Sequence, residues 1–184
     1  MRIVVARYNE NVDWTKEFDN VTIYNKGEPL PPEFNEIRLN NVGREGHTYY
    51  THIVNQYDNL DNFTVFLQAN PFDHSPNILE MLRRLQVNPS QFDFLSDKKI
   101  KCSMSGCNHH PGLPLQETFT ALFGFKPRNG FFIFGPGAQF IVSKQKIRKH
   151  SLNFYKKIVV MLEKDINPIE GYVIERFHGI ILNN

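Results

Sequence analysis

One stretch of the sequence is the most informative about fold and function: Thr64-Val-Phe-Leu-Gln-Ala-Asn-Pro-Phe-Asp-His74. Its first residues, Thr64 to Leu67, are β-branched or large and apolar, which is typical of a strand buried on both faces. Polar residues then follow at once, ending in the pair Asp73 and His74. In an open α/β sheet, ligands bind beside the carboxyl ends of the strands. The stretch therefore predicts a buried strand that runs directly into a functional site.

The residues on either side favour an α/β fold. Short apolar runs at 3–6 and 21–24 flank a short helix at 11–18, which is the strand-helix-strand opening of such folds. Apolar spacing of three and four predicts helices that start near Gly43 and after Ser75-Pro76, with Ser75 as cap of the second. Further strands are expected at 63–69, 131–134 and 139–142, and further helices at 115–123, 144–164 with a break near 150–151, and from Asn167-Pro168 onward. The segment 97–114 is expected to be a long loop.

Length and composition set the broad class. A chain of 184 residues with 41% hydrophobic residues is expected to form a single domain over 1–184. The net charge of +2 does not favour nucleic acid as a partner, and the Lys-rich region of 144–157 is typical of a solvated helix face. No apolar run has the length of a membrane span, so no membrane span is expected. These features predict a cytoplasmic, soluble protein in which Cys102 and Cys107 are free thiols.

Several groups of residues have both a functional and a structural interpretation. Asp73 and His74 suit a divalent metal, but they also suit a turn before a helix. Arg44 at a helix start suits phosphate, or it lies in solvent together with Glu45. Glu175 and His178 share a helix face and suit metal binding or acid–base chemistry, or an exposed polar stripe. Glu170 is explained as the partner of Asn167 in a capping box. A zinc site built from Cys102, Cys107, His109 and His110 matches no standard spacing.

A series of short strings, in order along nearly the whole chain, resembles a family long catalogued as a domain of unknown function. They are Val5-Ala-Arg-Tyr-Asn-Glu10, Ile23-Tyr-Asn-Lys-Gly27, Asn41-Val-Gly-Arg-Glu-Gly-His-Thr-Tyr49, His52-Ile-Val-Asn-Gln-Tyr-Asp58, Phe66-Leu-Gln-Ala-Asn-Pro-Phe-Asp-His74, Gly135-Pro-Gly-Ala-Gln-Phe-Ile-Val-Ser143 and Glu175-Arg-Phe-His-Gly179. Members of that family resemble small GT-A-type glycosyltransferases and are reported among large DNA viruses, fungi and plants. The resemblance implies an α/β, GT-A-like (Rossmann-like) mixed sheet flanked by helices, and, for a viral protein, a location in the host cytoplasm.

The resemblance also implies roles for particular residues. Ala6, Arg7, Tyr8 and Asn25 would lie near the base and ribose of a nucleotide-sugar donor, and Arg44, Gln68 and Asn70 would complete the donor site. Asp73, His74 and His178 would bind Mn²⁺ or Mg²⁺, and Glu175 would be the catalytic base toward a glycan or protein acceptor. Gln68-Ala69-Asn70 stands where such enzymes carry Asp-x-Asp. Two alternatives stay open: a non-catalytic nucleotide- or carbohydrate-binding module on the same fold, and a metal-dependent hydrolase that uses Asp73, His74, His109 and His110.

Overall fold

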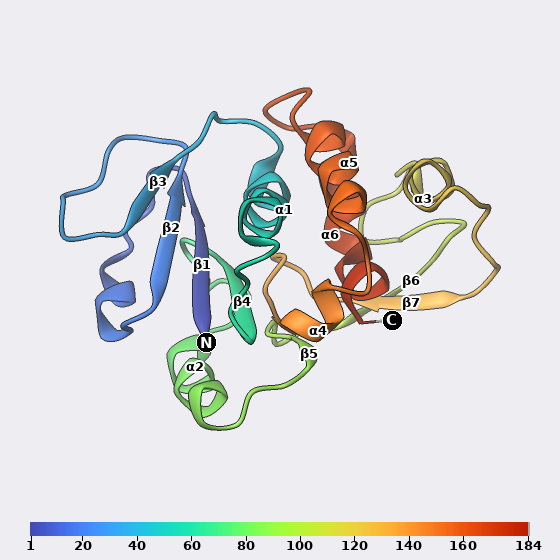
Figure 1. The fold of residues 1–184 in the computed structure, drawn as a ribbon. Helices are drawn as coiled ribbons and strands as arrows, with labels where there is room; N and C mark the ends of the chain where they lie inside the picture. The colour runs from blue at the N-terminus through green and yellow to red at the C-terminus, as the bar shows by residue number, and fades with distance from the viewer. Residues whose placement is uncertain (184) are drawn as a thin grey trace.

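A computed structural model describes residues 1–183, and its centre is a mixed six-stranded sheet with helices on both faces (Figure 1). The strand order in this sheet is β3-β2-β1-β4-β8-β5, and β6 and β7 form a separate two-stranded sheet. The strands are β1 (Arg2–Arg7), β2 (Val21–Asn25), β3 (Glu36–Arg38), β4 (Phe63–Gln68), β5 (Phe92–Phe94), β6 (Ile100–Ser103), β7 (Phe131–Phe134) and β8 (Phe140–Ser143). The predicted α/β class with a mixed, helix-flanked sheet is confirmed.

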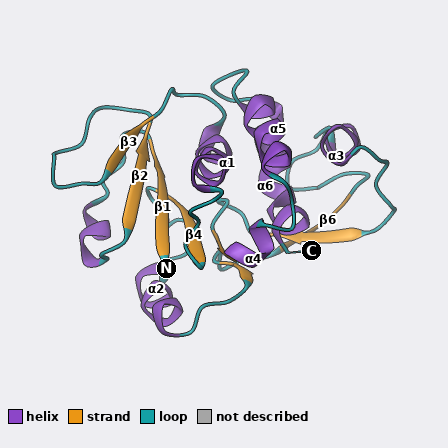
Figure 2. Ribbon diagram, viewed as in Figure 1, coloured by secondary structure: helices purple, strands orange, loops and turns teal. Residues whose placement is uncertain are grey.

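Helices separate single strands or pairs of strands along most of the chain, and three helices follow the last strand (Figure 2). They are the 3₁₀ helix η1 (Asp13–Glu17), α1 (Arg44–Gln56), α2 (Ile78–Val87), α3 (Leu115–Phe123), α4 (Lys144–Ile147), α5 (Leu152–Leu162) and α6 (Ile169–Leu182). The predicted break near 150–151 is confirmed, since Ser151 caps α5 by accepting a hydrogen bond from the Phe154 N–H. None of the helices in residues 1–183 combines the length and apolar character that crossing a membrane requires.

The chain reverses its direction of travel across the sheet at β1. Strands β1, β2 and β3 are parallel, and β1 also pairs in parallel with β4 on its other side. The first connection leads to β2 on one side of β1, and a later connection returns to β4 on the other side. This is a topological switch point, where the crevice at the carboxyl ends of open α/β sheets forms. Strand β8 then pairs antiparallel with β4 and makes the sheet mixed.

Successive residues of β1 point to opposite faces of the sheet and so build two cores. Val4 belongs to a core that includes α1, α5 and α6, and Ile3 and Val5 belong to a second core that includes α2. Because residues of a strand alternate between faces, an apolar run such as 3–5 fits a strand that is covered on both sides. The same alternation places Phe66 in the first core and Val65 and Leu67 in the second.

Some local expectations are wrong, and each has a local cause. The predicted loop at 97–114 contains β6, whose partner β7 lies far along the chain. Ser75 does not cap α2, because its hydroxyl donates to the Leu95 carbonyl and the helix begins at Ile78. Asn167 does not cap α6, because its Oδ1 accepts a hydrogen bond from Arg44 instead. Strands β3 and β5 have only three residues each and were not predicted.

The expectation of two free thiols is also wrong. Cys102 and Cys107 form a disulfide, since the chain reverses between Ser103 and Gly106 and brings the two Cα atoms to 4.8 Å. Both cysteines are buried and belong to the core that includes α1, α5 and α6. With these sulfurs joined to each other, the zinc site that combined Cys102 and Cys107 with His109 and His110 does not form.

Candidate functional site

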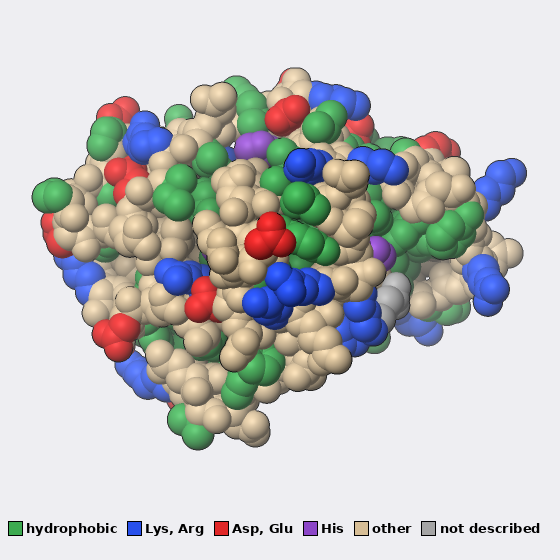
Figure 3. All heavy atoms as spheres, in the orientation of Figure 1, with side chains coloured by type: hydrophobic (Ala, Val, Ile, Leu, Met, Phe, Trp, Pro, Cys, Tyr) green, Lys and Arg blue, Asp and Glu red, His purple; other side chains and the backbone are tan. Residues whose placement is uncertain are grey.

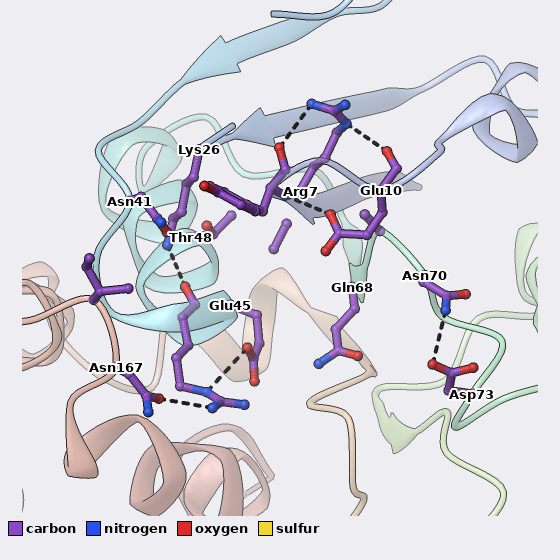
Figure 4. Close-up of a pocket in the computed structure, with 15 residues that line it drawn as sticks. Arg7, Glu10, Lys26, Asn41, Glu45, Thr48, Gln68, Asn70, Asp73 and Asn167 are labelled. Carbon is purple, nitrogen blue, oxygen red and sulfur yellow. Dashed lines mark hydrogen bonds and ion pairs between the residues drawn. The ribbon is translucent and has the colours of Figure 1, made fainter. Parts of the chain in front are cut away.

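A cleft of about 500 Å³ opens at the switch point of the sheet. Its walls come from the carboxyl ends of β1 and β4, the first turns of α1, and the segment before α6 (Figure 4). Most of its lining side chains are polar: Arg7, Tyr8, Glu10, Lys26, Asn41, Arg44, Glu45, Thr48, Gln68, Asn70, Asp73 and Asn167. A cleft at this position is where open α/β sheets bind their ligands.

Two cations border the cleft at the start of α1. The Lys26 ammonium donates hydrogen bonds to the carbonyls of Val42 and Arg44. Burial lowers the pKa of Lys26 to about 8, and the nearby Glu45 carboxylate opposes that shift. The Arg44 guanidinium lies over the Tyr172 ring at 4.2 Å, and its Nη1 donates to Asn167 at 3.1 Å. These cations, together with the positive end of the α1 dipole, favour a negatively charged ligand.

Arg44 is held in an unusual backbone conformation. Its φ is +53°, directly after Gly43 with a φ of +64°. A Cβ on Gly43 would lie 2.6 Å from the Leu162 carbonyl oxygen, so the chain passes α5 more closely than any other residue allows. Left-handed backbone at a non-glycine residue is costly and is concentrated at binding sites. In this case it turns the first residue of α1 toward the cleft.

Glu45 is the best-placed acid–base group, although the sequence pattern indicated a solvent position for it. Only 13% of its side chain is exposed, and it lines the cleft. Burial raises the pKa of Glu45, the neighbouring Glu175 adds to the rise, and Arg44, its own backbone N–H and Lys26 oppose it. A carboxyl with a raised pKa is suited to take up and return a proton near neutral pH.

Thr48 follows Glu45 by one turn of α1 and also faces the cleft (Figure 4). Its side chain is fully buried, yet its Oγ1 has no hydrogen-bond partner among residues 1–183. A helical threonine usually donates to the carbonyl four residues earlier, which here is the Arg44 carbonyl that already accepts from Lys26. A buried hydroxyl without a partner is costly, which makes Thr48, as a residue that lines the cleft, a candidate contact for a ligand's polar atom.

Of the residues predicted to bind the nucleotide-sugar donor, some line the cleft and others lie behind or beside it. Ala6, Tyr8, Arg44, Gln68 and Asn70 line the cleft. Arg7 also borders it, but its guanidinium is turned toward the neighbouring loops (Figure 4), where it donates to Tyr8, Glu10, Asn25 and Glu28. Asn25 is fully buried behind the cleft and holds Arg7 and the turn at Gly27. These two residues shape the site and do not face its centre.

The three predicted metal ligands do not come together. Asp73 borders the cleft and accepts a hydrogen bond from Asn70 at 3.0 Å. His74 lines a second pocket of about 410 Å³, which shares only Asp73 with the cleft. His178 is fully buried in the core, where its Nδ1 lies 2.9 Å from the Tyr50 hydroxyl. Within residues 1–183, no three His, Cys, Asp or Glu side chains are grouped so that they could hold a metal ion.

Glu175 lies behind the cleft and already has two partners. Its Oε1 accepts from the Gly137 N–H at 2.9 Å, and its Oε2 accepts from Arg176 at 3.1 Å. Arg176 is only 2% exposed, so the Glu175 carboxylate neutralises a buried cation. Glu175 and His178 are therefore not the exposed stripe that their spacing also permitted. Of the hydrolase set, His109 joins Asp73 and His74 in the second pocket, whereas His110 packs against Tyr172.

Comparison with known proteins identifies the family only. No curated protein matches the chain, and no solved structure does. One family model matches residues 3–184, and it carries the description "Protein of unknown function (DUF3431)". Because the match extends over nearly the whole sequence, the chain belongs to the DUF3431 family.

Proposed function

We propose that this protein is a glycosyltransferase that binds a nucleotide-sugar donor in the cleft at the carboxyl ends of β1 and β4. The observation that carries the proposal is the position of the cleft at the switch point, with Lys26, Arg44 and the unpartnered Thr48 hydroxyl on one wall. A dianionic diphosphate matches two cations at a helix N-terminus. Tyr8, whose side chain is half exposed at the rim, offers a face on which a base can stack.

In the proposed reaction, Glu45 acts as the base in place of the predicted Glu175. The Glu45 carboxylate takes the proton of an acceptor hydroxyl, and the hydroxyl oxygen forms a bond to the anomeric carbon of the sugar. The bond between that carbon and the diphosphate breaks, and the nucleoside diphosphate leaves with the electron pair. Lys26 and Arg44 stabilise the charge that develops on the leaving group. Glu175 already binds Gly137 and Arg176, which assigns it to positioning.

Calorimetry with UDP- and GDP-sugars tests donor binding, and release of nucleoside diphosphate tests turnover. We expect binding by the wild type, binding without turnover by Glu45→Gln, and unchanged turnover by Glu163→Gln, which alters an exposed carboxylate at the end of α5. Failure of every donor in the panel to bind would contradict the proposal. Dependence on Mn²⁺ or Mg²⁺ remains a prediction, and repeating the titrations with EDTA checks it.

A second candidate is a non-catalytic nucleotide-binding module that uses the same cleft. Gln68-Ala69-Asn70 favours it, because amide side chains at the end of β4 lack the charge that binds a bridging metal. This candidate predicts donor binding with no release of nucleoside diphosphate by the wild type and no change in Glu45→Gln. Measurable turnover would exclude it. The cytoplasmic location and the nature of the acceptor also remain predictions.

A further inference from the structure

The small sheet of β6 and β7 has an outer face that breaks the usual pattern of an exposed sheet. Its inner face is covered: Phe134 is fully buried, and the Phe132 ring lies 5.7 Å from Phe177 of α6. Successive residues of a strand point to opposite faces of the sheet. In a sheet with one face on the core and the other in solvent, the solvent-facing residues are usually polar, so polar residues are expected at the outer positions of β7. They are Phe131 and Ile133, which are 73% and 53% exposed. The outer face is therefore apolar and without a partner in the described chain.

One basic residue lies on this apolar face, and two more lie in the loop that leads into β7. Across β6 and β7, Lys101 pairs with Ile133 in register, and its ammonium lies 4.0 Å from the centre of the Phe131 ring. The loop that leads from α3 into β7 adds Lys126 and Arg128, which are both exposed. Between positions 98 and 133 the sequence has five Lys or Arg residues and one acidic residue, whereas the whole chain is nearly balanced at 21 to 19.

The basic residues lie at one end of the molecule. Figure 1 places β6, β7 and the loop after α3 together at the end away from β3. In the same orientation, Figure 3 shows Lys and Arg side chains projecting at that end, with hydrophobic atoms between them. The loop also carries Phe125, which is 59% exposed. The cleft at β1 and β4 is a separate site, because no residue of β6 or β7 lines it.

We propose that this face, defined by Phe131, Ile133, Lys101, Lys126 and Arg128, binds the surface of an anionic lipid membrane. Exposed aromatic and aliphatic side chains insert at the boundary between headgroups and acyl chains, and flanking cations attract anionic headgroups. The charge decides between occupants: a second copy of this chain would bring the same cations against each other, whereas an anionic membrane complements them. The proposal concerns attachment to a surface and does not depend on the reaction in the cleft.

Co-sedimentation with vesicles tests the proposal. We expect the protein to sediment with vesicles of equal parts phosphatidylcholine and phosphatidylserine, and not with phosphatidylcholine alone. The double variant Phe131→Ser, Ile133→Ser should bind at least about tenfold more weakly, because it removes the side chains that insert into the membrane. The double variant Lys126→Gln, Arg128→Gln should bind more weakly and depend less on salt, because it removes two charges that attract the headgroups. All four positions are exposed, so the fold should be retained, which circular dichroism checks.

Two control variants match these changes elsewhere on the surface. Val87→Ser removes an apolar side chain that is 88% exposed at the end of α2, and Lys156→Gln with Lys157→Gln removes two exposed cations of α5. Both should bind vesicles as the wild type does. The proposal would be overturned by equal sedimentation with both vesicle types, by no sedimentation, or by wild-type binding of the Phe131, Ile133 double variant. A dimer in solution that this double variant converts to monomer would assign the face to a second copy instead.

Discussion

Glu45 and Glu175 lie near each other but differ in what their carboxylates already bind. Glu45 borders the cleft, and its Oε2 lies 3.7 Å from the Arg44 Nε. The Glu175 carboxylate instead accepts a hydrogen bond from the Gly137 N–H and forms an ion pair with the buried Arg176. Removing a carboxylate that neutralises a buried cation is destabilising, because it leaves that cation without a counter-charge. The two residues should therefore respond differently to the same change from carboxylate to amide.

For Glu175→Gln we expect a loss of about 1–3 kcal/mol in the free energy of unfolding, because the charge-assisted bond to Arg176 is lost. Glu163→Gln, an exposed control, should stay within about 0.5 kcal/mol of the wild type. Urea denaturation measures both. A Glu175→Gln variant as stable as the wild type but without turnover would instead return the role of catalytic base to Glu175.

Buried histidines make stability depend on pH. Burial lowers the pKa of His178 to about 3 and that of His47 and His52 to about 4. The unfolded chain gains these protons below about pH 6.5, whereas the folded chain does not. Their contribution is therefore fully present above pH 6.5 and is lost as the pH falls toward their folded-state values.

His178→Gln tests this account, because glutamine stays neutral and can still bond to the Tyr50 hydroxyl. Between pH 6.5 and 4.5, the variant should lose about 2 kcal/mol less unfolding free energy than the wild type. Urea titrations at several pH values measure the difference. Parallel pH profiles for the two proteins would show that His178 takes up its proton equally in the folded and the unfolded chain.

At the scale of elements, the long and periodic segments could be predicted and the short or distant ones could not. The strand at Phe63–Gln68 and the helix at Leu115–Phe123 have strong local patterns, and the structure confirms both. Strand β6 was not predicted, because its partner β7 lies beyond α3 and only tertiary pairing stabilises it. Ser75 and Asn167 have the chemistry of helix caps, but Leu95 and Arg44 bind them instead.

The candidate site, too, could be predicted only in part. The carboxyl ends of β1 and β4 were predictable, because strand patterns identify them and the switch point brings Ala6, Tyr8 and Gln68 to one cleft. Glu45 and Thr48 were not predicted. The raised pKa of Glu45 and the burial of the Thr48 hydroxyl both come from packing against neighbouring elements, which the local sequence does not show. His178 was wrongly placed because helical spacing does not show whether a shared face is exposed or lies in the core.

Gly43→Ala tests whether the start of α1 depends on its close approach to α5. The alanine Cβ would lie 2.6 Å from both the Leu162 carbonyl oxygen and the His47 Cβ, at a φ of +64°. We expect a cost of about 2–4 kcal/mol in unfolding free energy. Gly112→Ala is the matched control, because its φ is +83° but no atom lies within 4 Å, so only about 1 kcal/mol is expected. Equal costs in thermal or urea unfolding would contradict the packing argument.

At the scale of the whole molecule, the disulfide lies within the segment that carries β6 and the proposed membrane face. Native protein prepared without reductant and unfolded in guanidinium should show no reactive thiol with a colourimetric thiol reagent, and two after reduction. Two reactive thiols before reduction would mean that the cysteines are separate in the isolated protein. The result also bears on location, because lasting disulfides are typical of oxidising compartments.

A crystal soaked with UDP and Mn²⁺ tests whether the cleft between β1, β4 and α1 is the donor site. We expect electron density for the nucleotide in that cleft, with its diphosphate beside Lys26 and Arg44 and a polar atom at the Thr48 hydroxyl. Density for the nucleotide in the second pocket beside His74 and His109, or an empty cleft at saturating nucleotide, would contradict it.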